Sequence, residues 1–203
     1  AEINIPDSVS TMKICAINGG DLEYLSIPDT VTTLENMIFR NTNNLKRIHI
    51  GSGVSSLSSQ FKAWISTPNG LKIEIDGNNQ NYKVEGNLIL TKNETEVVTY
   101  VDGNVQSQTI PTNVVKIRNG AFLGIDATEI ILQNTLKEIG AEAFRSCSNL
   151  ISIEIPSSVE TIGENAFFYC ANLETIKINK AEGDLAGAPW GAPKGDRVLV
   201  WGE

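Results

Sequence analysis

The amino-acid sequence predicts an α+β repeat solenoid: a right-handed coil with short strands on one face and short helical or 3₁₀ turns on the other. The first observation that favours this fold is a strand-like phrase whose last apolar residue recurs at steps of 22, 23, 25, 35, 22, 23 and 23 residues, at Ile5, Ile27, Ile50, Ile75, Ile110, Leu132, Ile155 and Ile178. The second is a bulky residue that follows most phrases at a fixed distance. Because one such unit cannot bury its apolar face alone, a period of this length indicates stacked coils.

Each phrase contains a strand with one buried face. In the first two copies, Ile3–Ile5 and Leu25–Ile27, apolar residues alternate with polar ones, which is typical of a half-buried strand. Pro6 and Pro28 follow at once. Because proline has no N–H to donate to the next coil, it ends the strand and turns the chain.

A second apolar pair follows each turn, and five residues after that pair comes the bulky residue, at Ile17, Phe39, Phe122, Phe144 and Phe167. The segment around it, for example E-N-A-F-F-Y, has room for only one or two turns of helix. We therefore predict a back wall of short helical or 3₁₀ turns whose bulky side chains point inward and stack on one another.

The repeat is interrupted in two places. The third coil loses the spacing, and either Phe61 or Trp64 is expected to fill the place of the missing Phe. The long coil at 76–110 contains two runs that are typical of strands, Leu88–Leu90 and Val97–Val101, on either side of a turn. We predict an inserted β-hairpin there, which either extends the sheet or forms a small flap.

Beyond Ile178 the repeat stops. Residues 181–203 are rich in Gly, Ala and Pro and end in a short strand-like run. Because a solenoid exposes its last coil, we interpret this segment as a cap to which Trp190 and Trp201 are suited, with a disordered linker as the alternative. The predicted domains are therefore a solenoid at 1–180 and a capping segment at 181–203.

The composition narrows the classes of function. A formal charge of −8 and a pI near 4.8 leave no basic field to meet phosphates, so nucleic-acid binding is not expected. No apolar run approaches the roughly 18 residues that a membrane span needs, and no signal peptide begins at Ala1. Because the chain opens inside a repeat, we expect its natural start to lie further upstream.

Two of the three cysteines, Cys147 and Cys170, occupy the same position in neighbouring repeats. Stacked strands lie about 4.8 Å apart, and this spacing is compatible with a disulfide. Two buried thiols in a column of small residues are the interpretation that we favour over a bridge. Cys15 lies off this register and is expected to be unpaired.

Catalytic and metal-binding patterns are not convincing in this sequence. The single histidine, His49, lies between two isoleucines of a predicted strand and is expected to face solvent. The Cys/His spacing of a zinc site and the oxygen spacing of a calcium loop are both lacking. We therefore expect neither an enzyme nor a bound cofactor or metal.

Ile139–Val159 carries the phrase I-G-x-x-A-F-x-x-C-x-x-L-x-x-I-x-I-P-x-S-V, and Ile162–Ile178 repeats it as far as that copy extends. This phrase resembles the BspA-like leucine-rich repeat, which Leu34–Val54 and Ile117–Leu132 match more loosely. The resemblance implies a leucine-rich-repeat-like coil. Members are typically bacterial surface or secreted proteins, and several are linked to adhesion to host extracellular proteins. The resemblance thus implies extracellular or cell-surface display but names no ligand, because one scaffold carries many functions.

The side chains that point outward from the strands form the candidate binding surface. In a curved solenoid the strands line the concave face, and every second side chain points away from the core. Tyrosine and arginine, which are favoured as binding anchors, occur on adjacent coils. The candidate residues on this strand face are Tyr24, Arg47, His49, Lys72, Glu74, Glu129, Glu154 and Lys177.

Two functional hypotheses follow. The first is a non-catalytic surface module that binds a host extracellular or matrix protein, or a glycan, through the strand face. The second is a structural spacer within a larger bacterial surface protein. The strand face carries charges of both signs and no aromatic ladder, and the face of a spacer would look the same. The sequence does not predict an oligomeric state.

Overall fold

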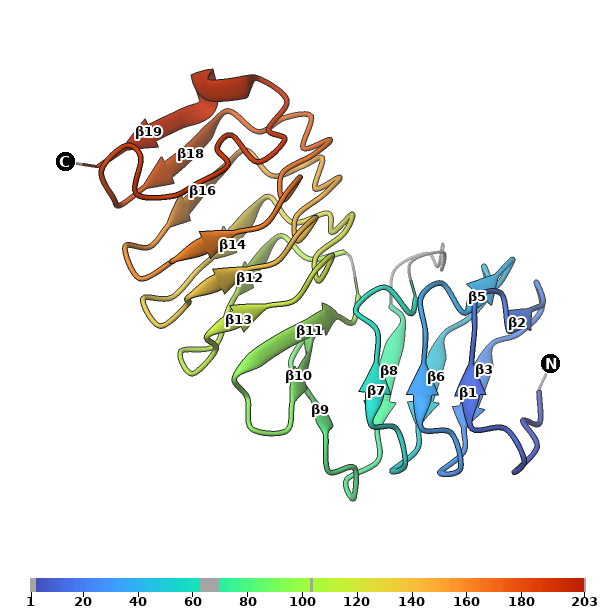
Figure 1. Cartoon of the computed structure of the whole chain (residues 1–203). Helices are drawn as coiled ribbons and strands as arrows, with labels where there is room; N and C mark the ends of the chain where they lie inside the picture. Colours follow the sequence, from blue (N-terminus) through green and yellow to red (C-terminus); the bar gives the residue numbers. More distant parts are fainter. Residues whose placement is uncertain (1–2, 63–69, 103, 203) are drawn as a thin grey trace. The chain divides into compact units, whose positions relative to one another are not determined.

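The computed structural model describes residues 3–62, 70–102 and 104–202 (Figure 1). Contacts between residues divide the chain into two compact units, Ala1–Asn93 (unit 1) and Glu94–Glu203 (unit 2). Each unit is a stack of coils built almost entirely from short strands and turns. The predicted boundary near residue 180 does not coincide with the division between these units, and the capping role of 181–203 stays a prediction.

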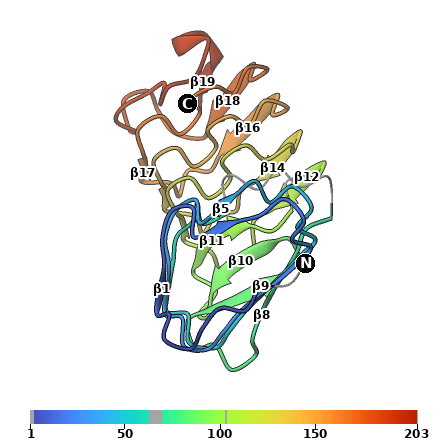
Figure 2. The same cartoon turned by 90° about the vertical axis from the view of Figure 1, so that its right-hand side faces the viewer.

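Unit 1 has three walls. Its long-strand wall is a parallel sheet of four-residue strands, β3 (Tyr24–Ile27), β6 (Arg47–Ile50) and β8 (Lys72–Ile75). Its short-strand wall is the parallel sheet β1 (Thr11–Met12), β4 (Thr33–Leu34) and β7 (Ser56–Leu57). The turn wall pairs β2 (Ile17–Asn18) with β5 (Phe39–Arg40). Figure 2 looks nearly along this stack, so that its coils overlap around a common interior.

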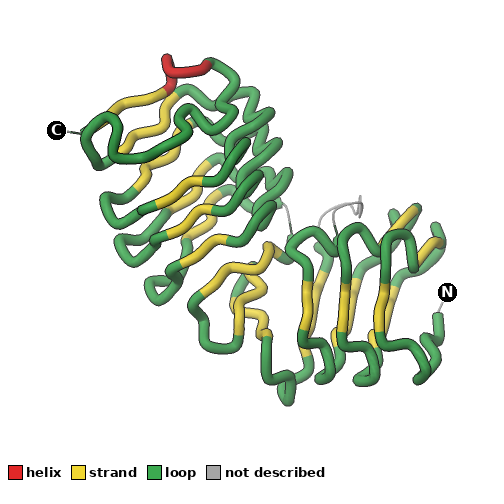
Figure 3. Tube along the Cα trace, viewed as in Figure 1, coloured by secondary structure: helices red, strands yellow, loops and turns green. Residues whose placement is uncertain are grey.

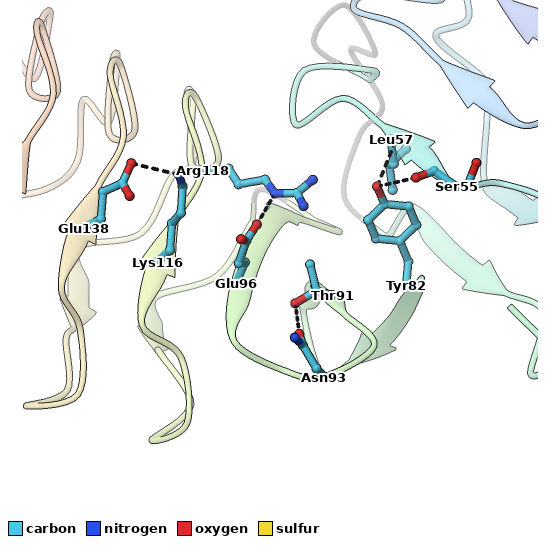
Figure 4. A network of polar contacts seen from close by, with 9 residues as sticks. All are labelled: Ser55, Leu57, Tyr82, Thr91, Asn93, Glu96, Lys116, Arg118 and Glu138. Carbon is cyan, nitrogen blue, oxygen red and sulfur yellow. Dashed lines mark hydrogen bonds and ion pairs between the residues drawn. The ribbon is translucent and has the colours of Figure 1, made fainter. Parts of the chain in front are cut away.

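Unit 2 repeats this arrangement. The long-strand wall contains β12 (Ser107–Thr109), β14 (Glu129–Ile131), β16 (Ser152–Ile155), β18 (Thr175–Ile178) and β19 (Leu199–Trp201). The short-strand wall contains β11 (Glu96–Tyr100), β13 (Lys116–Ile117), β15 (Glu138–Ile139) and β17 (Thr161–Ile162). Ion pairs join neighbouring coils of this short-strand wall, including Glu96–Arg118 at 2.6 Å and Lys116–Glu138 at 2.9 Å (Figure 4).

The predicted alternation within the strands accounts for the core. Of the eight recurring apolar residues at the strand ends, Ile75 and Leu132 are half-buried and the other six are buried. In the parallel walls, buried strand residues lie beside their equivalents in the next coil, as Leu25, Ile48 and Ile73 do, so each unit has a stacked apolar core. Within the part of the chain that the structure describes, no helix is long and apolar enough to cross a membrane.

The predicted α+β class is wrong, because the turn wall is not helical. Among the described residues the only helix is the 3₁₀ turn η1 (Gly195–Val198), the single red segment of Figure 3. The structure is therefore a β-solenoid. What replaces the predicted helical turns is a repeated pattern of tight turns around each core Phe.

Those turns cannot form a helix for two reasons. Gly120 and Gly124, on either side of Phe122, have φ of 63° and 70°, and a left-handed residue cannot continue a right-handed helix. The Phe122 N–H donates to the Ala143 carbonyl of the next coil at 2.8 Å, so it is not available to its own turn. The same pair of left-handed positions recurs around Phe39, Phe144 and Phe167, at Met37 and Asn41, Glu142 and Ser146, and Asn165 and Tyr169.

The turn wall of unit 2 contains a stack of aromatic rings, as the repeated Phe predicts. The ring centroids of Phe122 and Phe144 lie 5.6 Å apart and those of Phe144 and Phe167 lie 5.4 Å apart, with nearly parallel planes. Tyr100 extends the stack below Phe122 at 6.5 Å, and Trp190 extends it above Phe167 at 6.4 Å. Such pairs add to the free energy of burial beyond the area they remove from water.

The third coil keeps its core position through Phe61, which is fully buried and lies 6.3 Å from Phe39 between ring centroids. Trp64, the other predicted candidate, lies outside the described residues. Both predicted strands of the long coil are present, as β10 (Leu88–Thr91) and β11. The antiparallel partner of β10 in unit 1 is β9 (Tyr82–Glu85), which the sequence analysis did not identify as a separate strand.

Residues 181–203 contain the last coil of unit 2. β19 pairs in parallel with β18, and the Trp190 side chain is only 2% exposed. The Trp190 Nε1–H donates to the Ala186 carbonyl at 2.8 Å, and its ring centroid lies 6.4 Å from that of Trp201. Trp190 therefore occupies, above Phe167, the place that a further core Phe would take.

Cys147 and Cys170 are buried free thiols, as favoured from the sequence. Their Sγ atoms donate to the carbonyls of Phe122 at 3.2 Å and Phe144 at 3.0 Å, each in the preceding coil. The contact with Cys170 and burial together raise the pKa of the Cys147 thiol. Because both thiols are fully buried and donate to backbone carbonyls, neither is accessible as a nucleophile, and we interpret them as structural.

Candidate binding surface on the long-strand walls

The parallel register of unit 1 brings five of the eight predicted residues onto one sheet. Tyr24, Arg47 and Lys72 lie in one row across β3, β6 and β8, and His49 and Glu74 lie in the row beside it. Their side chains point away from the core, because the residues between them are the buried ones of each strand. This outward patch of unit 1 is called the Arg47 patch below.

Arg47 links the two rows of the Arg47 patch. Its Nε and Nη2 atoms lie 3.1 Å and 2.5 Å from Oε2 of Glu74. Its guanidinium carbon lies 5.8 Å from the centroid of the Tyr24 ring, within cation–π range. The hydrogen bond and the charge of Glu74 raise the pKa of Arg47. The guanidinium is therefore held in place between an aromatic ring and a carboxylate.

A hollow of about 640 Å³ adjoins the Arg47 patch. Besides Arg47, Lys72 and Glu74, it is lined by the turn that precedes β6, notably by Asn44 and Lys46. Asn44 donates its Nδ2–H to the Gly20 carbonyl, and Lys46 pairs with Glu23 at 3.0 Å. The sequence analysis missed these turn residues, because alternation identifies outward positions only within strands.

His49 lies beside Glu74 in the strand register. Its neighbour Asp29 accepts a hydrogen bond from the Ser52 N–H at 2.6 Å, and this bond lowers the pKa of Asp29, with a smaller contribution from the charge of His49. Asp29 therefore orders the turn after β6. Within the described ranges, no group of three or more His, Cys, Asp or Glu side chains could hold a metal ion.

The other three predicted residues, Glu129, Glu154 and Lys177, lie in unit 2. Glu129 accepts a hydrogen bond from Ser107 at 2.8 Å on the neighbouring strand. Glu154 and Lys177 are register partners on β16 and β18, joined at 3.0 Å. Hydrogen bonds from Asn179 and Lys177 lower the pKa of Glu154. These three residues are a separate set from the Arg47 patch.

In the described coils, charged, aromatic and hydroxyl side chains alternate with buried apolar ones along each long strand. The chain is therefore a repeat protein whose strands present a polar surface to solvent. The chain belongs to the BspA type leucine rich repeat family, which matches residues 1–81 and 96–184 in six copies. The resemblance seen in the sequence is thereby confirmed.

Solved structures of bacterial leucine-rich repeat proteins share this fold. A leucine-rich repeat protein from Eubacterium ventriosum superimposes with a TM-score of 0.73 at 25% identity, over 87% of this chain and 48% of that chain. The pneumococcal vaccine antigen PcpA superimposes with a TM-score of 0.57 at 16% identity, over 79% of this chain and 51% of that chain. A leucine rich cell surface protein from Faecalibacterium prausnitzii superimposes with a TM-score of 0.50 at 17% identity, over 84% of this chain and 61% of that chain.

The chain thus spans about half the length of the first two of these structures. A comparison with curated proteins finds no match.

Proposed function

We propose that this chain is a non-catalytic module of a cell-surface or secreted protein, and that it binds a protein or a glycan through the Arg47 patch. Membership of the BspA type family supports display outside the cell, and one of the similar structures is a cell surface protein. Within this proposal, the family resemblance favours adhesion to a host extracellular or matrix protein.

The placement of Arg47 is the observation that carries the proposal. A long side chain normally loses rotamer freedom when it binds, and this loss opposes association. Here Glu74 and Tyr24 already restrict the Arg47 guanidinium. Because a guanidinium has five N–H groups, donors remain for a partner. Tyrosine and arginine are also the residue types most often found at energetic hot spots.

A spacer within a longer surface protein is the second candidate. The chain covers 48% of the Eubacterium ventriosum structure, so further domains could carry the binding. A spacer would tolerate any change in the Arg47 patch that preserves the fold.

A binding screen of this chain against extracellular matrix proteins and a glycan array distinguishes the two candidates. If the Arg47 patch binds, Arg47→Ala and Tyr24→Ala each weaken the affinity for the bound partner by about tenfold or more. Lys137→Ala is the matched control, because Lys137 is also exposed and ion-paired but directly precedes β15 of unit 2. Binding that both patch variants retain in full would reject the Arg47 patch as the site, and no binding above background would support the spacer.

A further inference from the structure

The turn wall of unit 2 carries two aromatic residues that the core does not require. Phe168 and Tyr169 directly follow the core residue Phe167. At the two corresponding positions the other coils carry polar or small residues in most cases: Arg40 and Asn41, Leu123 and Gly124, and Arg145 and Ser146. The Tyr169 side chain is 60% exposed, so it contributes little to the buried column.

The backbone conformation at Tyr169 is also unfavourable for a tyrosine, so folding alone does not explain this residue. Its φ is 60°, in the left-handed region that favours Gly and tolerates Asn. The equivalent positions follow this preference at Asn41 and Gly124. A bulky, exposed tyrosine at such a position is best explained by what its ring does at the surface.

Phe168 and Tyr169 form a small platform with a charged rim. Their ring centroids lie 4.0 Å apart with an angle of 37° between the planes, so the half-buried Phe168 ring packs against the exposed Tyr169 ring. The Arg145 guanidinium carbon lies 5.5 Å from the Phe168 ring and 5.8 Å from the Tyr169 ring, and Arg145 pairs with Glu142 at 2.9 Å. Arg145 is thereby held in cation–π contact with both rings.

Further polar groups complete the rim. Asn165 belongs to the same turn as Phe168, whose N–H donates to the Asn165 carbonyl at 3.0 Å, and Glu164 precedes it. A Cβ at Gly191 would come within 3.0 Å of the Asn165 side chain and 3.3 Å of Phe168, so this glycine leaves room for both. The polar side chains of this region therefore include the Arg145 guanidinium, with its partner Glu142, and the Asn165 amide, whose Nδ2 lies 3.4 Å from Oε1 of Glu164.

We propose that this platform, formed by Phe168, Tyr169 and Arg145, binds a neutral pyranose ring of a glycan, and that it is a site separate from the Arg47 patch. One face of a pyranose consists of C–H groups that pack on an aromatic ring, while its edge carries hydroxyls that donate to carboxylates and accept from guanidinium and amide groups.

Size and charge favour this ligand over others. A protein interface buries about 800 Å² on each partner around an apolar core, whereas the apolar part of this platform is only two rings within polar surroundings. Glu142 and Glu164 offset the charge of Arg145, and the chain has a formal charge of −8, so an anionic sugar is disfavoured.

The test uses an array of neutral glycans together with sialylated and sulfated ones, probed with the chain and its variants. Tyr169→Asn and Phe168→Arg introduce residues found at these positions in unit 1, and Tyr169→Asn also suits the left-handed backbone. We expect binding to at least one neutral class, reduced tenfold or more by either change. Lys137→Ala, at an exposed ion-paired residue outside both surfaces, is expected to leave it unchanged.

A urea unfolding curve for Tyr169→Asn that matches or exceeds that of the parent chain shows that lost binding is not lost folding. The proposal is overturned by no binding to any neutral glycan, by binding to acidic glycans only, or by full binding of Tyr169→Asn. Neutral-glycan binding lost in Tyr24→Ala but kept in Tyr169→Asn would support the Arg47 patch and reject the aromatic platform.

Discussion

The buried hydroxyl of Thr42 lacks a hydrogen bond that the cysteine thiols at the equivalent positions of later coils make. Cys147 and Cys170, at the same place of later repeats, each donate to a carbonyl of the preceding coil. The Thr42 side chain is fully buried, and its Oγ1 has no hydrogen-bond partner. An unpaired buried hydroxyl costs roughly 1–3 kcal/mol, so this position weakens unit 1.

Replacing Thr42 should therefore stabilise the protein. We expect Thr42→Val to raise the free energy of unfolding by about 1 kcal/mol, because it removes the unpaired hydroxyl and keeps the branched shape. Thr99→Val is the matched control: Thr99 is 1% exposed, but its Oγ1 donates to the Ala121 carbonyl at 3.2 Å. The control should lose about 1 kcal/mol in the same urea titration. Equal changes in both variants would contradict this explanation.

Single residues also explain why the turn wall was mispredicted. The glycines at 120 and 124 suggest left-handed backbone, but Glu142 and Tyr169 adopt it without any such signal. What holds them there is the next coil, whose carbonyls accept the N–H of the core Phe in each turn: Phe144 donates to Ala166 at 2.9 Å and Phe167 to Trp190 at 3.1 Å. Because this partner is tertiary, local spacing suggested a helical turn where the structure has a β-solenoid turn.

At the scale of elements, Tyr82 of β9 completes the edge of the short-strand wall of unit 1. Its hydroxyl accepts from the Leu57 N–H at 3.1 Å and donates to the Ser55 carbonyl at 3.2 Å (Figure 4). These two backbone groups, one in β7 and one directly before it, would otherwise lack the partners that a next coil supplies. A side chain thus substitutes for a backbone strand where the repeat is interrupted.

Removing that hydroxyl tests this role. We expect Tyr82→Phe to lower the free energy of unfolding by about 1–2 kcal/mol, because the ring stays buried while two backbone groups lose their partner. Tyr24→Phe, at a more exposed tyrosine, should change stability by less than about 0.5 kcal/mol. Faster amide exchange at Leu57 in Tyr82→Phe would locate the effect, and unchanged exchange there would count against it.

The ion pair between β16 and β18 gives unit 2 a pH dependence of known sign. Asn179 and Lys177 lower the pKa of Glu154 below its ordinary value of 4.5. The contribution to stability is therefore complete above that value, and it is lost as the pH falls through the lowered pKa of the folded state.

Glu154→Gln should reduce this dependence. Urea unfolding between about pH 6 and pH 3 should show a smaller loss of stability in the variant than in the parent chain, and salt should narrow the difference. The double variant Lys177→Met with Asn179→Ala should behave in the same way, because it removes both donors. A loss on acidification that Glu154→Gln does not alter would assign the effect to other carboxylates.

The elements of the candidate site were predictable where the period held. The 22- to 25-residue steps place Tyr24, Arg47 and Lys72 in one row, and the register confirms that placement. The diagonal contact between Arg47 and Glu74 was not predictable, because it depends on side-chain conformation. Tyr100 was missed as a core ring because it follows Val97 by three residues, where the regular coils leave five.

At the scale of the molecule, each coil contacts chiefly its neighbours, so stability is expected to be local. The aromatic stack of unit 2 makes this concrete. It runs from Tyr100 through the three Phe residues to Trp190 and Trp201, one ring or two per coil. The end of such a stack is its weakest point, because an unprotected last ring would face water.

Trp190→Ala tests whether residues 181–203 cap unit 2. Removing a large buried aromatic side chain costs roughly 3–5 kcal/mol, and we expect the loss to fall on the coils nearest to it. Hydrogen exchange should accelerate strongly in β18 and β16 and much less in β11 and β13. Val200→Ala, at a side chain that is 52% exposed in the same segment, is the control and should have little effect. Equal acceleration throughout unit 2 would instead show that the unit opens as a whole, because coupling between coils then exceeds the cost of the lost ring.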